Sequence, residues 1–155
     1  YFLDFTHRES CGKCTFCRVG TTRMFETLER IVAGKGEMAD LEFLEDIGPK
    51  IRMGSLCGLG QTAPNPVLAT LRYYRHEYEA HVKDHQCDAL QCNALVDMYL
   101  DKTNCIKCKL CIKTCPVGAI SDDFVIDNDK CTRCNACKDV CPKKTIHRVK
   151  KGSEQ

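Results

Sequence analysis

Apolar residues recur at spacings of three and four in the first half of the chain, and each run of them forms one stripe along a helix. The first stripe consists of Met24, Phe25, Leu28, Ile31 and Val32. The second consists of Leu41, Leu44 and Ile47, and the third of Val67, Leu68, Leu71, Tyr74 and Tyr78. Because one-sided stripes pack against each other, the pattern predicts a small helical bundle with these residues in its core.

The ends of these helices are indicated by glycine, proline and capping residues. Gly34 follows the first stripe, and Asp40 is placed to cap the second helix. We expect Gly48-Pro49 to bend or end that helix, because proline lacks the backbone N–H that a helix interior uses. Asn65-Pro66 is typical of a helix start, with Asn65 as the N-cap.

The second half of the chain has short apolar stretches instead of helical stripes. Residues 98–100 and 124–126 each precede a cysteine-rich loop, and residues 119–120 and 146–149 each follow one. These stretches predict small antiparallel strands, with a short helix between the strands of each pair. The expected fold is therefore α+β: a small helical bundle followed by a β-α-β repeat domain.

An exact internal repeat organises this half. The pattern Cys-x2-Cys-x2-Cys-x3-Cys-Pro occurs twice, 26 residues apart. The first copy contains Cys105, Cys108, Cys111 and Cys115, and the second contains Cys131, Cys134, Cys137 and Cys141. In this signature, three cysteines wrap one [4Fe-4S] cluster and the cysteine before proline binds the other cluster. One predicted site is therefore Cys105, Cys108, Cys111 and Cys141, and the other is Cys131, Cys134, Cys137 and Cys115.

Composition supports metal binding over disulfide bonding. The chain has 14 cysteines in 155 residues, which is typical of a disulfide scaffold or of metal ligation. The opening residues contain no apolar signal-peptide core, so we expect a reducing cytoplasm. Structural zinc and a disulfide knot are the alternatives, but neither accounts for the duplicated spacing. Residues 98–149 resemble the bacterial dicluster ferredoxin family.

A third Cys-x2-Cys-x2-Cys occurs near the start of the chain. Cys11, Cys14 and Cys17 are followed by the distant Cys57, and these four residues suit another [4Fe-4S] cluster, with zinc as the alternative. Glycines at positions 54, 58 and 60 allow the backbone to approach the cluster closely. Residues 1–80 resemble the cluster-binding C-terminal domain of the flavin- and NADH-binding subunit of respiratory complex I. Phe16 departs from the proline that is usual in that family.

Two further cysteines lie between the two regions. Cys87 and Cys92, with His81 six residues before Cys87, provide three ligands for a tetrahedral zinc site, and His85, His76 or an upstream residue is the candidate fourth. The alternative is a pair of buried free cysteines beside a solvated helix end. We expect a helical domain at residues 1–82, a Cys/His linker and hinge at 83–97, a ferredoxin-like domain at 98–150 and a tail at 151–155.

Charge is unevenly distributed although the net charge is only +2. Residues 1–101 contain 11 Lys or Arg and 15 Asp or Glu, whereas residues 102–155 contain 12 and 6. The basic half suits an acidic protein partner such as ferredoxin, and no recognition helix or aromatic platform indicates nucleic acid. The longest apolar runs are too short for a membrane span. Gly34-x-Gly36-x-x-Ala39 follows no predicted strand, so we do not expect a nucleotide site there.

The order of these motifs resembles the C-terminal region of the flavoprotein subunit of multimeric NAD(P)-dependent iron-only hydrogenases, some electron-bifurcating, and of related formate dehydrogenases. This resemblance implies upstream FMN, NAD(P) and [2Fe-2S] sites, a hydrogenase catalytic subunit and a small [2Fe-2S] subunit as partners, and a cytoplasmic location in an anaerobic prokaryote. The segment itself is expected to transfer electrons and to have no catalytic residue. The alternatives are a freestanding ferredoxin-like carrier and a zinc-stabilised interaction module.

Overall fold

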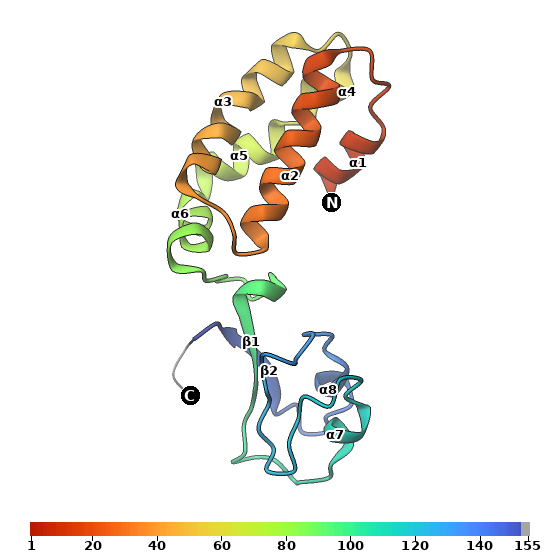
Figure 1. The fold of residues 1–155 in the computed structure, drawn as a ribbon, viewed down its shortest axis with the longest axis vertical. Coiled ribbons are helices and arrows are strands. Elements are labelled where there is room, and N and C mark those ends of the chain that lie inside the picture. Colours follow the sequence, from red (N-terminus) through yellow and green to blue (C-terminus); the bar gives the residue numbers. More distant parts are fainter. Residues whose placement is uncertain (153–155) are drawn as a thin grey trace. The chain divides into compact units, whose positions relative to one another are not determined.

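The chain forms two compact units, Tyr1–Gln86 and Cys87–Gln155, in a computed structural model that describes residues 1–152. The first unit is helical, and the second combines a two-stranded sheet with two short helices (Figure 1). The mixture of helix and small sheet confirms the predicted α+β class. Residues 153–155 of the expected tail lie outside the described residues.

The helical unit contains six α-helices and two π-helical turns among its described residues. In chain order these are α1 (Phe2–Arg8), η1 (Phe16–Gly20), α2 (Thr21–Val32), α3 (Met38–Gly54), α4 (Gly58–Thr62), α5 (Asn65–Tyr73), α6 (Arg75–Glu79) and η2 (Ala80–Asp84). Helix α3 packs against both α2 and α5, and α1 packs against α2. The core therefore lies around α3.

The predicted apolar stripes form most of this core. Its buried residues are Leu3, Met24, Ile31, Leu41, Leu44, Ile51, Val67, Leu71 and Val82. The prediction was wrong for Val32 and Tyr74, which are 46% and 53% exposed. Val32 is the last residue of α2, and Tyr74 lies at the break between α5 and α6, so neither side chain keeps the direction of its stripe.

Helix α3 differs from the prediction at both ends. Its N-cap is Glu37, and Asp40 is the third residue of the helix. The two residues form a capping box, in which each side chain accepts the backbone N–H of the other residue. The helix also continues through Pro49 to Gly54. Ile51, beyond the proline, is fully buried, so burial of that side chain favours continuing the helix.

The third predicted helix is divided. Pro64, not Asn65, is the N-cap of α5, and the backbone leaves the helical conformation at Tyr74, where φ is −127° and ψ is 32°. Helix α6 then begins at Arg75. The two halves remain connected by the hydrogen bond between the Thr70 and Tyr78 hydroxyls, 2.8 Å long.

The second unit has short elements connected by long loops. Its elements are the 3₁₀ turn η3 (Asn93–Leu95), β1 (Val96–Leu100), α7 (Leu110–Thr114), α8 (Ala136–Asp139) and β2 (Ile146–Lys150). Strands β1 and β2 are antiparallel, with Val96 opposite Lys150 and Leu100 opposite Ile146. The other two expected strands, at residues 119–120 and 124–126, form only an isolated antiparallel bridge between Ile120 and Ile126.

Removal of the Asp40 side chain should destabilise the helical unit. Asp40 is 6% exposed, accepts the Glu37 N–H at 2.9 Å and pairs with Arg30 through both carboxylate oxygens. We expect Asp40→Ala to lower the free energy of unfolding by about 1–3 kcal/mol, because a buried cap and its charged partner lose their bonds. Urea unfolding followed by circular dichroism measures this change.

The matched control is Asp46→Ala on the same helix, because Asp46 forms only an exposed ion pair with Lys50. Its effect should stay below about 0.5 kcal/mol. Equal effects of the two substitutions would contradict the role given to the buried cap.

Candidate metal centres

The four N-terminal cysteines line one cavity in the helical unit. Its lining residues are Glu9, Ser10, Cys11, Cys14, Cys17, Ser55, Cys57 and Leu59, and its volume is about 80 Å³. Cys17 lies in η1 and is buried, whereas Cys57 directly precedes α4 and is exposed. The structure therefore brings together the three local thiols and the one 40 residues further along the chain.

Backbone and hydroxyl groups point at the sulfur atoms of this cavity. The Leu56 N–H donates to Cys14 Sγ at 3.5 Å, and Ser10 Oγ lies 3.4 Å from Cys17 Sγ. Such hydrogen bonds stabilise thiolate sulfur and adjust the potential of an iron–sulfur cluster. Phe16, the departure from the family pattern, lies against Gly54, where any side chain would overlap its ring. Phe16 is therefore accommodated without changing the ligands.

The eight cysteines of the repeat line two further cavities, four in each. One cavity is lined by Cys105, Cys108, Cys111 and Cys141, which we call the first-loop site. The other is lined by Cys115, Cys131, Cys134 and Cys137, which we call the second-loop site. Each set takes three cysteines from one copy of the repeat and one from the other. The fourteen cysteines form no disulfide bond among the described residues.

Two short helices connect these sites. Cys111 lies in α7 and Cys115 directly follows that helix, whereas Cys137 lies in α8 and Cys141 comes two residues after its end. Each helix thus contributes a ligand to one site, and the chain that leaves it contributes a ligand to the other.

The two ligand loops have the same backbone geometry. Lys107 and Arg133 occupy equivalent positions with φ of 55°, and each N–H donates to the preceding cysteine sulfur, Cys105 or Cys131, at 3.4 Å. A positive φ is uncommon for residues other than glycine, and it persists only where the surrounding structure requires it. Here it turns the amide toward sulfur, which is the arrangement that a cluster-binding loop needs.

Burial keeps some of these thiols protonated while no metal is bound. Burial raises the pKa of Cys137 to about 11, and the neighbouring Cys131 adds to the effect. Burial also raises the pKa of Cys111. At Cys134, by contrast, a hydrogen bond from the Ala136 N–H lowers the pKa of an exposed thiol. Because metals bind thiolates, loading of each site must release protons from its buried cysteines.

One polar neighbour of the sulfurs was not predicted from the sequence. Thr145 Oγ1 lies 3.3 Å from Cys141 Sγ. Burial opposes the thiolate of Cys141, but hydrogen bonds from Thr145 and from the backbone of Lys143 and Lys144 outweigh it and lower the pKa. The equivalent position in the first copy of the repeat is Ala119. This difference between the copies was the one sequence feature that could have pointed to Thr145.

Cys87 and Cys92 lie in one tight turn. Burial opposes ionisation of Cys87, but the backbone N–H groups of Cys92 and Gln91 and the Cys92 thiol lower its pKa. Burial and the neighbouring Cys87 raise the pKa of Cys92 to about 11. The pKa values of the two thiols are therefore shifted in opposite directions, and a metal ion that binds Cys92 must displace its proton.

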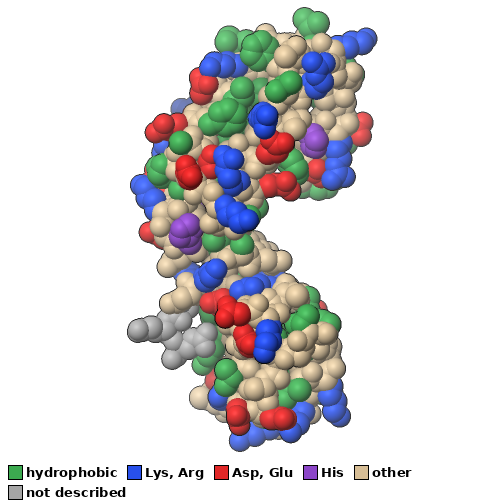
Figure 2. All heavy atoms as spheres, in the orientation of Figure 1, with side chains coloured by type: hydrophobic (Ala, Val, Ile, Leu, Met, Phe, Trp, Pro, Cys, Tyr) green, Lys and Arg blue, Asp and Glu red, His purple; other side chains and the backbone are tan. Residues whose placement is uncertain are grey.

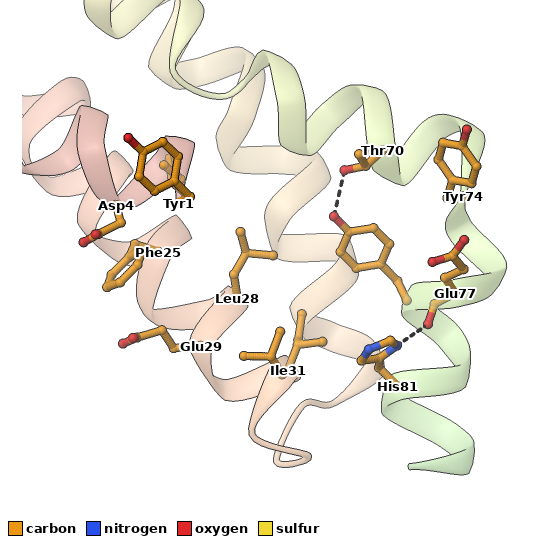
Figure 3. Close-up of a pocket in the computed structure, with 13 residues that line it drawn as sticks. Tyr1, Asp4, Phe25, Leu28, Glu29, Ile31, Thr70, Tyr74, Glu77 and His81 are labelled. Atoms are coloured by element: carbon orange, nitrogen blue, oxygen red, sulfur yellow. Dashed lines mark hydrogen bonds between the residues drawn. The ribbon is translucent and has the colours of Figure 1, made fainter. Parts of the chain in front are cut away.

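His81, the histidine predicted to bind metal together with Cys87 and Cys92, lies in the turn η2 at the end of the helical unit. His81 Nδ1 lies 2.7 Å from the Glu77 carbonyl oxygen (Figure 3). Since a carbonyl only accepts hydrogen bonds, Nδ1 carries the proton and Nε2 carries the lone pair that binds metal.

The largest cavity of the helical unit is separate from the cysteine sites. It has a volume of about 560 Å³ and lies between α1, α2, α5 and α6 (Figure 3). Its wall is apolar, with Phe25, Leu28 and Tyr78, and it carries the carboxylates of Asp4, Glu29 and Glu77. None of the described residues that line it is a cysteine, so the candidate metal centres are the smaller cavities.

Sequence comparison is consistent with these sites. Residues 1–81 match the NADH-ubiquinone oxidoreductase-F iron-sulfur binding region, and residues 98–121 and 124–147 each match the 4Fe-4S binding domain. The HndC subunit of the NADP-reducing hydrogenase of Solidesulfovibrio fructosivorans is 50% identical over 121 residues, 78% of this chain and 25% of the relative. The F subunit of the NADH-quinone oxidoreductase of Streptomyces coelicolor is 46% identical over 86 residues, 56% of this chain and 19% of the relative.

The chain spans a quarter or less of the length of these two relatives. In residues 1–152, no helix is long and apolar enough to cross a membrane. The N-terminal match covers more than half of the chain and contains all four cysteines of the first cavity. The chain therefore belongs to the family of the NADH-ubiquinone oxidoreductase-F iron-sulfur binding region, followed here by two 4Fe-4S binding domain repeats.

Proposed function

We propose that this chain relays single electrons through three [4Fe-4S] clusters, between an upstream FMN and NAD(P) site and a ferredoxin or hydrogenase subunit. The observation that carries the proposal is the set of three cavities, each lined by four cysteines. Cysteine thiolates are the usual ligands of [4Fe-4S] clusters, which serve in electron transfer.

The protein's own contribution is to place the ligands and to set the environment of each cluster. The proposed ligands are Cys11, Cys14, Cys17 and Cys57 in the helical unit, with the first-loop and second-loop sites in the other. Backbone N–H groups and the hydroxyls of Ser10 and Thr145 would stabilise the thiolates. Because α7 and α8 each serve both repeat sites, the two clusters would lie close enough for rapid electron exchange.

The surroundings of this module are inferred from its relatives. The two relatives are named as subunits of an NADP-reducing hydrogenase and of an NADH-quinone oxidoreductase. The longer matched stretch with HndC, 121 residues against 86, favours the hydrogenase setting, in which electron bifurcation is one mode of action. A fragment of a formate dehydrogenase and a freestanding carrier are the alternatives, and the sequence that precedes Tyr1 would distinguish them.

We also propose a structural zinc ion at His81, Cys87 and Cys92. Two cysteine sulfurs and a histidine Nε2 form a donor set typical of zinc, and Nδ1 is already oriented by the Glu77 carbonyl. Zinc carries no electrons, so its role would be to stabilise the segment that contains these residues.

The pairing of cysteines can be tested by iron content. The reconstituted full-length protein should contain about twelve irons more than its upstream sites contribute. Cys105→Ser/Cys141→Ser removes two ligands of one proposed cluster, so about four irons should be lost. Cys105→Ser/Cys115→Ser removes one ligand from each of two clusters, so about eight irons should be lost. The opposite order of losses would show that each copy of the repeat binds its own cluster.

The zinc proposal predicts about one zinc ion per chain by elemental analysis. Cys87→Ser/Cys92→Ser should abolish zinc binding while the iron content stays unchanged. Cys11→Ser/Cys57→Ser is the matched control, because it should remove about four irons and leave zinc in place. Retention of zinc in the first variant would contradict the assignment.

A basic second unit should attract an acidic electron-transfer partner. The basic residues that the sequence offers for this attraction are Lys107, Lys109, Lys113, Arg133, Lys138, Lys143 and Lys144, although Arg133 is paired with Asp97. We expect the rate of electron transfer to an acidic ferredoxin to fall roughly tenfold between about 20 and 300 mM salt, because salt screens the attraction. Stopped-flow absorbance measures this rate, and a rate that salt leaves unchanged would rule out electrostatic docking.

A further inference from the structure

We propose that the acidic partner docks on one face of the ferredoxin-like unit only, the face around the first-loop site. We call this the lysine face and define it by Ile106, Lys107, Lys109, Leu110, Lys143 and Lys144. The inference rests on the proposed electron-transfer function and specifies which of the two repeat clusters exchanges electrons with the partner.

The 26-residue repeat makes the two sites directly comparable. Residues of the lysine face correspond, in the same order, to Thr132, Arg133, Asn135, Ala136, Val117 and Gly118 around the second-loop site. The backbones agree, since Lys109 and Asn135 have φ of 59° and 66°, and Gly118 and Lys144 have φ of 60° and 52°. The two sites therefore differ mainly in the side chains that surround them.

Side chains of the lysine face point to solvent. Ile106 and Leu110 are 56% and 44% exposed, and Lys107, Lys143 and Lys144 are exposed as well. Lys109 forms an ion pair with Asp122 at 2.8 Å, but both side chains remain more than half exposed. Lys and Arg side chains are visible along the lower rim of this unit in Figure 2. Two apolar residues are thus accompanied by four cationic ones.

Two of the equivalent side chains of the second loop, Arg133 and Asn135, are hydrogen-bonded inside the unit. Arg133 donates to the Val96 carbonyl at 3.0 Å, to the Cys131 carbonyl at 2.9 Å and to Asp97 at 3.2 Å. Its side chain is only 18% exposed, and the Asp97 carboxylate neutralises its charge. Arg133 is therefore committed to strand β1 and contributes little positive potential toward a partner.

Arg148 attaches the second loop to the segment before β1. Its guanidinium donates to the Arg133 carbonyl and to Asn135 Oδ1, each at 3.2 Å. It also donates to the carbonyls of Leu90 and Gln91 at 3.0 Å. In the first copy the equivalent of Arg148 is Asp122, which is exposed and holds Lys109 at the surface. Only the second-loop site is therefore tied into the fold by its surrounding side chains.

This asymmetry favours an acidic protein with a small apolar centre as the occupant of the lysine face. Lysine is a strongly hydrated point charge that speeds encounter, and a small apolar contact suits a short-lived electron-transfer complex. Exposure of a ligand does not distinguish the sites, because Cys108 and Cys134 are both exposed. The distinction rests on charge, because Val117 beside the second-loop site is 42% exposed, close to the 44% of Leu110.

A pair of matched charge reversals tests the proposal in the full-length protein. Lys107→Glu/Lys143→Glu changes the lysine face, and Lys130→Glu/Lys138→Glu makes the same charge change beside the second loop. Protein reduced with stoichiometric dithionite is mixed with an oxidised acidic [2Fe-2S] ferredoxin, which accepts one electron from a reduced cluster. We expect a roughly tenfold lower second-order rate for the first variant and less than about a twofold change for the second at low salt.

Iron content and the electron paramagnetic resonance spectrum must match wild type in both variants, which excludes misfolding. Ile106→Ser gives an independent readout, because it should slow transfer without changing the salt dependence. Equal slowing by both reversals, or greater slowing by the second, overturns the one-face inference and leaves the attraction of an acidic partner intact. A rate unchanged by either reversal overturns docking by charge itself.

Discussion

The convergence of four thiolates on each small cluster is the constraint on which this fold depends. A Cys-x2-Cys-x2-Cys loop supplies three thiols from one short segment, so every site needs a fourth from elsewhere in the chain. In the helical unit that fourth is Cys57, which follows the end of α3. In the second unit each copy of the repeat supplies the fourth thiol of the other. Neither copy can complete its site alone, which explains why the two form one unit with a very small core.

Because the core of the second unit is small, backbone groups form much of the surroundings of its cysteine sulfurs. The hydrophobic core of the second unit includes Cys111 and Cys137. Some of the predicted metal ligands are therefore also core residues. Left-handed residues such as Lys107 and Arg133 then direct amides at sulfur. Burial raises the pKa of Cys137 to about 11, so a metal that binds this ligand must displace its proton. Folding and loading are therefore coupled.

Cysteine spacing, combined with the two-cluster ferredoxin signature and a family resemblance, predicted the four cysteines that line each cavity. Helical periodicity predicted most of the helical core. It did not predict that α3 continues through Pro49, since the burial of Ile51 that favours this is a tertiary effect. Nor did the sequence patterns predict the break at Tyr74, or that residues 119–120 and 124–126 form only an isolated bridge. Arg148 was unremarkable in the sequence, because its partners lie 13 to 58 residues away and only the fold brings them together.

The two repeat sites have the same backbone conformation because they belong to two copies of one sequence pattern. They differ in the side chains that surround the cysteines. The contact between positions 109 and 122 is retained between positions 135 and 148, but an exposed Lys–Asp pair in one copy is an Asn–Arg hydrogen bond in the other. The Lys109–Asp122 pair keeps its charges at the surface. In the second copy, the Arg148 guanidinium donates hydrogen bonds to backbone carbonyls. Substitutions at a few positions are therefore enough to place exposed charge beside one site and internal hydrogen bonds beside the other, on one shared backbone geometry.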